Sequence, residues 1–538
     1  MLRRAWKPVL GTALLVGAPS YLYYRHYYHK PATETFDLAM RVRGPDGRPT
    51  SVTRRLPLLS KAQADARLVE HATLKTVTRP GGVVWKQATA ILASNDPIED
   101  ANASAFIHRD VADKAYPGDL LFFAVMDGHG GPETSRLLSQ VLIPAVALEL
   151  HQLTSPDSTS QKAGALQTLK ALLYPTSSSI SAQIPLDSDP ELVKRAIQDA
   201  FVNLDTELVT APLRILSQYV DKKSLKKGAI PDLSSHPMAI ASMQPAISGS
   251  CAIMALFDTA HENLYVACTG DSRAVAGIYE ESPDGQGRWR VEALSEDQTG
   301  RNPSELKRLQ SEHPADEANA VVTRGRILGG LEPSRAFGDA RYKWPREVQT
   351  LLQKTFLEGN DQSMRPTPAL LKTPPYVTAR PEVTHRKLSL PTTDSPHPAS
   401  ALRFVVLATD GLWDELSSEE VVALVGGYLQ GLKGTVPKAR LSDLVKTSTG
   451  APTVNGKAAR TKVSEGSWAF VDDNVGTHLI RNALGGGDDD KMRKLLSIPP
   501  PASRSYRDDI TVTVVWWEDG AEASSSSTAA EEKVRAKL

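Results

Sequence analysis

The feature that most constrains the fold is a short apolar run that stops at a glycine-rich turn carrying an acid and a histidine. Residues 121–126 are all apolar and lead directly into Asp127, Gly128 and His129. A continuous apolar run bounded by turn residues is typical of a strand buried on both faces, and glycine permits close approaches that a side chain forbids. The sequence therefore predicts a buried strand that delivers Asp127 and His129 to its tip.

Other apolar runs also meet acids at their ends. Asp271 follows the run 264–269, and Asp410 follows the run 404–409. A further acid, Asp508, comes just before an apolar run instead of after one. In an antiparallel sheet the start of one strand lies beside the end of its neighbour. We therefore expect these acids and Asp127 to converge at a shared sheet edge.

Converging acids predict a site for a divalent cation. Carboxylates that repel one another stay ionised together only with a cation between them. Ligands that are all oxygen favour Mg²⁺ or Mn²⁺ over Zn²⁺, which prefers nitrogen and sulfur. A single Asp beside Gly is above all a turn residue, so it is the repeated placement against apolar runs that favours a metal. His129, which alone would more often be a turn or surface histidine, becomes a candidate general acid beside Asp127.

Composition excludes several classes of protein. The 538 residues are 41% hydrophobic, which is enough to bury a large core. The 62 basic residues balance the 62 acidic ones, so no overall charge draws the chain to nucleic acid, and no nucleic-acid partner is expected. The two cysteines, Cys251 and Cys268, lie in apolar strand-like runs. They exclude a disulfide scaffold and favour an intracellular setting.

Residues 1–30 are predicted to be a targeting segment. Five basic residues precede the first acid, Glu34, and surround an uncharged run from Pro8 to Tyr24. The run is marginal in length for a bilayer span, which needs about 20 residues. We predict mitochondrial import with anchoring in the inner membrane, and a secretory signal peptide is the alternative. The sequence leaves open whether the body faces the matrix or the intermembrane space.

The remaining chain is predicted to be a linker, one large domain and a tail. Residues 31–57 are polar and form the linker, residues 58–518 form the domain, and residues 519–538 are expected to be disordered. Insertions are expected near residues 220–245, on the surface, and near 435–467. Apolar spacing and capping signals predict helices at 60–71, 132–150, 166–173, 190–210, 302–312 and after Ser417, and strands at 83–92, 251–258, 263–268 and 510–517.

Seven short motifs, in order along the chain, resemble those of type 2C metal-dependent Ser/Thr protein phosphatases. The resemblance covers roughly residues 60 to 517. That family folds as two antiparallel sheets packed face to face with helices on both outer faces, so an α+β four-layer sandwich is implied. The motifs are Glu99-Asp100, Asp127 to Gly131, Ser248 to Ala252, Gly270 to Arg273, Ser334 to Asp339, Asp410 to Asp414 and Arg507 to Asp509.

The resemblance implies two metal ions and a role for each acid. Asp127 would bridge the ions, and Asp410 and Asp508 would complete one of them. The backbone carbonyl of Gly128 would bind the other. A hydroxide bridging the ions would attack phosphorus, and His129 would protonate the departing serine or threonine oxygen. The acids implied in supporting positions are Glu99 and Asp100, which would orient water, and Asp271 with Asp414, which resemble a weaker third-metal site.

One position departs from the family pattern. Many members place an arginine four residues before the motif glutamate to hold the substrate phosphate, whereas this chain has Asn95 there. Loss of a bidentate cation should weaken phosphate capture. Asparagine at this place is similar to the pyruvate dehydrogenase phosphatase branch, so that complex is an implied substrate. The alternatives are another mitochondrial or intermembrane-space phosphoprotein, an inactive pseudophosphatase binding module, a membrane-anchored adaptor, or a two-metal nuclease.

Overall fold

The structure is a computed structural model of the chain. It describes residues 34–43, 49–78, 83–108, 118–153, 189–220, 230–281, 287–390, 400–448 and 465–519. Contacts divide the chain into two compact units, residues 1–67 with 489–499, and residues 68–488 with 500–538. The predicted targeting segment, the predicted helix at 166–173 and most of the tail lie outside the described residues. Within the described ranges, no helix combines the length and apolar character needed to cross a bilayer.

The smaller unit contains a hairpin where the sequence was interpreted as a linker. Strand β1 (Thr35–Arg43) pairs antiparallel with β2 (Pro49–Pro57). In β1 the apolar side chains alternate with polar ones, and this period of two was overlooked because the stretch is polar overall. Helix α3 (Lys61–Val69) confirms the predicted helix after Ser60. The smaller unit also contains α15 (Asp489–Ser497), whose Ser497 hydroxyl accepts a hydrogen bond from the backbone N–H of Leu59 at 2.8 Å.

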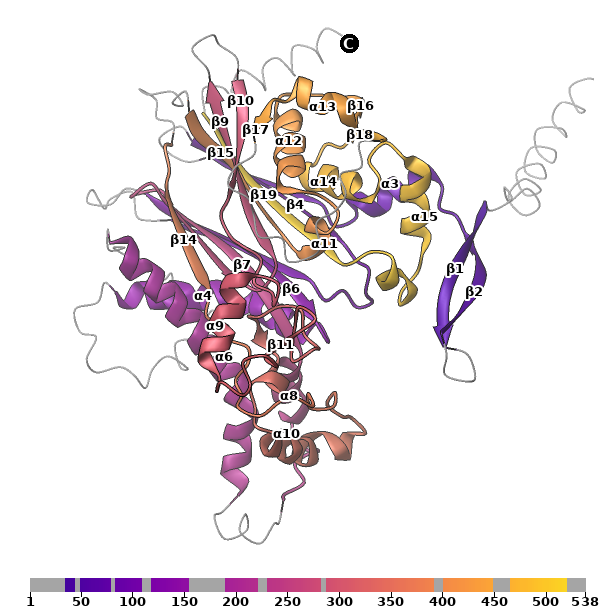
Figure 1. Ribbon diagram of the computed structural model, residues 1–538. Coiled ribbons are helices and arrows are strands. Elements are labelled where there is room, and N and C mark those ends of the chain that lie inside the picture. Colours follow the sequence, from indigo (N-terminus) through magenta and orange to yellow (C-terminus); the bar gives the residue numbers. More distant parts are fainter. Residues whose placement is uncertain are drawn as a thin grey trace, which may run out of the picture. The chain divides into compact units, whose positions relative to one another are not determined.

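The larger unit is built on two sheets that run antiparallel apart from one parallel pair, β10 with β17 (Figure 1). The first sheet has the strand order β14-β8-β7-β6-β5, and the second has the order β17-β10-β9-β15-β19-β4-β3. Strands of the first sheet are β5 (Ala101–His108), β6 (Asp119–His129), β7 (Gly249–Asp258), β8 (Asn263–Thr269) and β14 (Glu382–Lys387), with β13 (Phe337–Gly338) paired to β7. Strands of the second are β3 (Thr73–Thr78), β4 (Val83–Leu92), β9 (Arg273–Glu281), β10 (Gly287–Ala293), β15 (Ser400–Ala408), β17 (Thr447–Ser448) and β19 (Ile510–Asp519).

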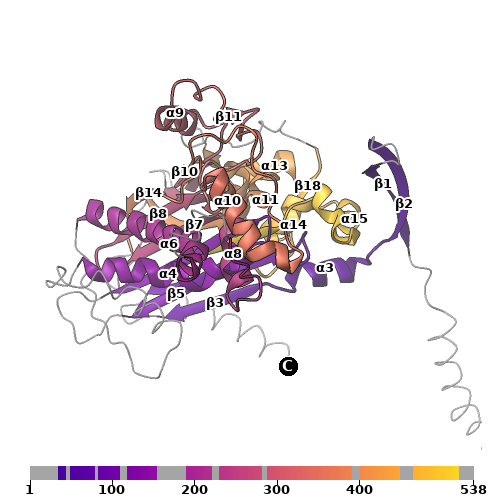
Figure 2. The same ribbon diagram turned by 90° about the horizontal axis from the view of Figure 1, so that it is seen from below.

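Helices cover the outer face of each sheet, which confirms the predicted four-layer α+β sandwich. Helix α4 (Glu133–Gln152) packs on β5 and β6, and α6 (Pro190–Tyr219) packs on β8 and β14 (Figure 2). On the other sheet, α12 (Ser418–Leu429) packs on β9 and β10, and α14 (Val475–Leu484) on β4 and β19. The shorter elements are α8 (Ala239–Ile247), α9 (Pro303–Glu312), α10 (Arg346–Leu352), α11 (Asp410–Trp413), α13 (Lys438–Leu444), β11 (Val322–Thr323), β12 (Arg326–Ile327), β16 (Gly434–Pro437) and β18 (Ser467–Phe470).

Strand β6 is buried on both faces, as its apolar run predicted. Phe122 and Met126 lie in the core beneath α4 and α6, whereas Phe123 and Val125 lie in the core between the two sheets. Successive side chains of a strand point to opposite faces. Asp127 therefore shares the face of Val125 and points toward the second sheet.

The stretch predicted as a surface insertion near 220–245 contains α8, which buries one face. Ala239 and Met243 of α8 are 1% and 0% exposed and pack in one cluster with Leu208 and Trp344. Their spacing of four residues places them on one helix face. That short apolar face was not recognised in the sequence, so the surface interpretation is wrong for α8. The other predicted insertion, 435–467, lies largely outside the described residues.

A buried ion pair holds the loop before β13 against α9. Arg335 donates to both carboxylate oxygens of Glu305, at 2.6 and 3.0 Å, and these side chains are 5% and 4% exposed. Arg335 also reaches the exposed Glu382 at 2.8 Å. Burial alone raises the pKa of Glu305, but the hydrogen bonds from Arg335 and Arg308 outweigh it and lower that pKa to about 2.

The variant Glu305→Gln is expected to lower the free energy of unfolding by about 2 kcal/mol, because Arg335 keeps only Glu382 as a carboxylate partner. The pKa of Glu305 is lower in the folded chain, so its contribution is full above its ordinary pKa of 4.5 and is lost as pH falls toward 2. Urea unfolding at pH 7 and pH 4 would measure both effects. Glu296→Gln, which removes an exposed acid, is the control. Equal stability of the two variants would contradict the role given to the pair.

Candidate metal centre

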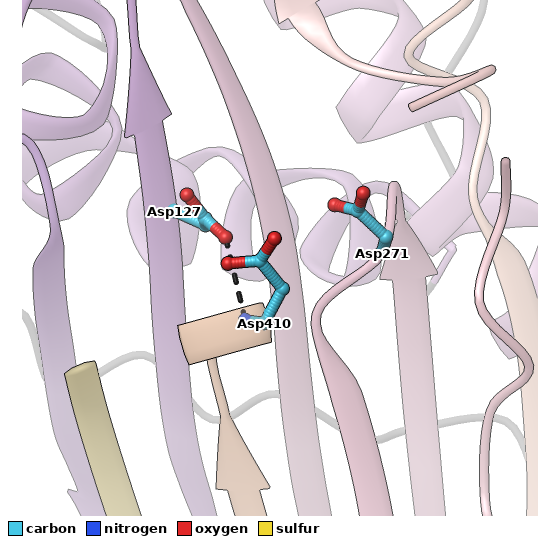
Figure 3. Close-up of side chains that lie close together, drawn as sticks. All are labelled: Asp127, Asp271 and Asp410. Carbon is cyan, nitrogen blue, oxygen red and sulfur yellow. Dashed lines mark hydrogen bonds between the residues drawn. The ribbon is translucent and has the colours of Figure 1, made fainter. Parts of the chain in front are cut away.

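Three of the predicted acids meet at the ends of strands (Figure 3). Asp127 lies near the end of β6, Asp271 follows β8, and Asp410 begins α11 directly after β15. One carboxylate oxygen of each lies within 4.8 Å of the others. The backbone N–H of Asp410 also points to the Asp127 carboxylate, with 3.5 Å between the nitrogen and Oδ2. The structure thus brings together side chains from positions up to 283 residues apart.

The acids do not share the edge of one sheet, and that prediction is wrong. Strands β15 and β19 are neighbours, with Ala408 opposite Val512, so Asp410 and Asp508 come from the second sheet. Asp127 comes from the first sheet. Because its side chain points toward the second sheet, the acids meet between the two sheets.

The acids fit a divalent cation. Burial, and then repulsion from Asp410, Asp100 and Asp271, raises the pKa of Asp127 well above its ordinary 3.8. Burial together with the charge of Asp410 raises the pKa of Asp508 to about 7, although Arg504 opposes the shift. Carboxylates that hold protons so tightly lack a counterion, which a cation would supply. Carboxylate oxygens are ligands that Mg²⁺ and Mn²⁺ accept.

Asp508 lies beside the three clustered acids and is paired with an arginine. Arg504 donates from Nη1 to Asp508 Oδ2 at 2.6 Å, from a position four residues earlier in the chain. Its side chain is 51% exposed. Arg504 was not among the site residues predicted from the sequence, and its position four residues before Asp508 is the signal that could have identified it.

Asp509 orders the loop that carries the supporting acid Glu99. Its carboxylate accepts hydrogen bonds from the backbone N–H groups of Asn95 and Glu99, both at 2.9 Å. The side-chain amide of Asn95 also donates to Asp509, at 2.9 Å, and approaches Glu99 at 3.4 Å. The position expected to lie near the substrate phosphate therefore has its side chain engaged inside this loop.

Glu99 and Asp100 each hold the end of a strand. Glu99 accepts a hydrogen bond from the backbone N–H of Gly131 at 2.7 Å, which fixes the turn after β6. Asp100 accepts one from the Thr409 hydroxyl at 3.0 Å, directly before Asp410. Asp414 lies at the other end of α11, where its N–H donates to the Asp410 carbonyl at 2.8 Å, and it is not one of the three clustered acids.

Gly128 must be a glycine for the strand to pass this loop. A Cβ at Gly128 would lie 2.0 Å from the carbonyl oxygen of Glu99 and 2.7 Å from the Ser135 hydroxyl. No side chain fits at such distances. The glycine therefore lets the end of β6 lie against the segment that carries Glu99 and Asp100.

His129 is held by an acid to which the sequence analysis gave no role. Its Nε2 lies 2.6 Å from Oδ2 of Asp339, whose backbone is left-handed with φ of 48°. Burial lowers the pKa of His129, but the charge and hydrogen bond of Asp339 outweigh it, and the net pKa is raised above 6.5. Asp339 thus favours the protonated imidazole.

Comparisons with known proteins identify the family. A family model described as protein phosphatase 2C matches residues 203–430. A protein phosphatase 2C homolog of Schizosaccharomyces pombe is 36% identical over 420 residues, which cover 78% of this chain and 77% of the relative. The chain belongs to the protein phosphatase 2C family. It is an enzyme, a protein phosphatase.

Two other relatives of this phosphatase are named as mitochondrial enzymes. The pyruvate dehydrogenase (acetyl-transferring) phosphatase 1 of Saccharomyces cerevisiae is 35% identical over 443 residues, which cover 79% of this chain and 67% of the relative. The human pyruvate dehydrogenase (acetyl-transferring) phosphatase 2 is 32% identical over 439 residues, which cover 77% of this chain and 73% of the relative.

Proposed function

We propose that this phosphatase removes phosphate from phosphoserine and phosphothreonine in proteins, using two ions of Mg²⁺ or Mn²⁺. The clustering of Asp127, Asp271 and Asp410, with one oxygen of each within 4.8 Å of the others, is the observation that carries the proposal. Carboxylates that repel one another at this site can stay ionised together only if a cation lies between them.

The proposed ligands follow the family pattern. Asp127 would contact both ions, Asp410 and Asp508 would complete one, and the Gly128 carbonyl would bind the other. Asp271 and Asp414 would form a weaker third site. Bound divalent cations supply an activated water and offset the charge of the phosphoryl group. Glu99 and Asp100 would orient water around the ions while holding the strand ends.

His129 would protonate the leaving oxygen of the substrate. The bond to Asp339 fixes its ring and favours the protonated form, which a general acid requires. Arg504 is a cation at the same site. Many family members have an arginine at the position that Asn95 occupies in this chain, and Arg504 would take over the role of that arginine. Its half-exposed guanidinium can turn from Asp508 to a bound phosphate.

We further propose a mitochondrial phosphoprotein, in particular the pyruvate dehydrogenase complex, as the substrate. The names of two relatives at 35% and 32% identity and the basic, acid-free N-terminus support this. Anchoring in the inner membrane through residues 1–30 stays a prediction from the sequence. The side of that membrane on which the enzyme acts would decide whether it meets the complex in the matrix.

The proposed reaction is tested by offering substrates of the rival functions side by side. With Mn²⁺ present, the purified chain is expected to release phosphate from a phosphoserine peptide and to leave plasmid DNA intact, because the overall charge is neutral. Phosphate release is measured colorimetrically and DNA cleavage on a gel. Peptide binding without release would favour the pseudophosphatase, and cut DNA would favour the nuclease.

A further inference from the structure

A pocket of about 360 Å³ opens beside His129 and is not used by the proposed chemistry. Its walls come from the end of α8, from the loop after β12, and from residues 341–365, which follow Asp339. Helices α8 and α10 lie side by side at this place (Figure 1 and Figure 2). Because His129 lines the pocket and is the proposed proton donor, a polypeptide presenting phosphoserine to His129 lies within reach of the pocket.

Two arginines of the pocket have no acidic partner. Neither Arg341 nor Arg365 forms a side-chain hydrogen bond or ion pair with any residue in the described ranges. Arg341 is half-buried, with its Nε out of contact with solvent and its guanidinium 5.4 Å from the centre of the Tyr342 ring. Arg365 is exposed and lies beside Gly130, with 3.8 Å between its guanidinium carbon and the place of a Cβ there.

Three other arginines of the larger unit are paired with acids. Arg504 pairs with Asp508, Arg335 with Glu305, and Arg326 with Glu332. Among the described residues that line the pocket, Asp339 is the only acid, and it is bonded to His129. A partly desolvated cation without an anion is unfavourable. The pocket therefore offers positive charge for an anion that comes from outside the chain.

The rest of the pocket mixes polar side chains, among them Gln244, Gln362 and Ser363, with four apolar ones. Leu357 and Met364 are buried at its base, and Ile247 and Leu331 are half-buried in its walls. A small inorganic ion bound to the arginines would leave these apolar side chains in contact with water. An acidic side chain combines a carboxylate for the arginines with methylene groups for the apolar walls.

We propose that this pocket binds an acidic side chain that flanks the phosphoserine in the substrate polypeptide. The inference rests on the proposed function, because it needs a phosphopeptide with its phosphoserine at His129. The guanidinium of Arg341 lies 5.4 Å from the centre of the Tyr342 ring, and Arg365 lines the pocket as an exposed residue. The two arginines thus set the preference among phosphopeptides and take no part in the chemistry.

The test compares phosphoserine peptides that carry Asp or Ala at one position within three residues of the phosphoserine, on either side. At the position that reaches the pocket, kcat/KM for the Asp peptide is expected to exceed that for the Ala peptide by about tenfold, which corresponds to about 1.4 kcal/mol. A third peptide with a second phosphoserine there distinguishes a carboxylate from a phosphate as the preferred anion. The preference should fall as salt is added.

Variants of the two pocket arginines then test whether these residues cause the preference for the Asp peptide over the Ala peptide. In Arg365→Gln and Arg341→Gln the ratio should fall to about two or below, and in Arg365→Glu a Lys peptide should be preferred over the Asp peptide. Arg195→Gln, which removes an exposed arginine of α6, should keep the ratio of the unmodified chain. Arg365 is exposed, so its variants are expected to fold even if those of Arg341 do not.

The outcomes separate this inference from the proposed function. Equal kcat/KM for Asp and Ala peptides at every position would overturn the inference and leave the phosphatase function intact. A preference that survives in both Arg365 variants would overturn it as well. No phosphate release from any of the peptides would instead count against the proposed function.

Discussion

Asp127→Asn is expected to reduce phosphate release from a phosphoserine peptide by about 1000-fold or more, the largest effect of any single substitution in this chain. Asn keeps the size of the side chain and removes one charge of the acid cluster. Asp127 lies with Asp271 and Asp410 inside 4.8 Å, so its loss weakens every cation held there. Titration calorimetry with Mn²⁺ should show the corresponding loss of affinity.

The melting temperature of Asp127→Asn shows whether its loss of activity is caused by unfolding. Without cations the repelling carboxylates destabilise the fold, since burial and repulsion raise the pKa of Asp127 well above 3.8. The metal-free Asp127→Asn chain should therefore melt at the same temperature as the unmodified chain or higher. Asp199→Asn, which changes an exposed acid on α6, is the control and should keep full activity. Retained Mn²⁺ affinity in Asp127→Asn would remove this residue from the metal centre.

His129→Ala is expected to lower kcat by about 100-fold while Mn²⁺ affinity stays close to that of the unmodified chain. The imidazole would supply a proton to the leaving oxygen and is held by Asp339, 2.6 Å away, rather than by the acid cluster. Asp339→Asn keeps the ring but loses the charge that favours its protonated form, so a smaller loss of about tenfold is expected.

Measuring both kcat and Mn²⁺ affinity in the same variants decides the role of His129. Calorimetry on His129→Ala and Asp127→Asn under the same conditions should give near-normal affinity for the first variant and strongly reduced affinity for the second. If both variants lose Mn²⁺ to the same extent, His129 supports the metal centre and is not the general acid.

The sequence alone predicted several local parts of this enzyme correctly. The apolar run before Asp127 is a strand buried on both faces, and the run before Asp410 and the run after Asp508 are neighbouring antiparallel strands. Ser417 caps α12 with the predicted capping box. These features depend on residues within a few positions of one another, where apolar spacing, glycine and capping side chains act directly on the backbone.

Some local features were missed because their signals are weak. The hairpin β1–β2 alternates apolar and polar residues in a stretch that is polar on average. Helix α8 buries a short apolar face that spans only two turns. In both cases composition outweighed periodicity in the interpretation, and the structure shows that the periodicity was the better guide.

Only the tertiary structure decided where the predicted acids meet and which partners hold the other site residues. It places Asp127, Asp271 and Asp410 between two sheets instead of at one edge, brings Asp339 to His129 across 210 residues, and directs Asn95 to Asp509 across 414 residues. It also leaves Arg341 and Arg365 unpaired in one pocket. Contacts over such separations depend on the order of the strands and the packing of one sheet on the other. Strand order and sheet packing are properties of the whole fold. They cannot be predicted from a pattern of residues that are close together in the sequence.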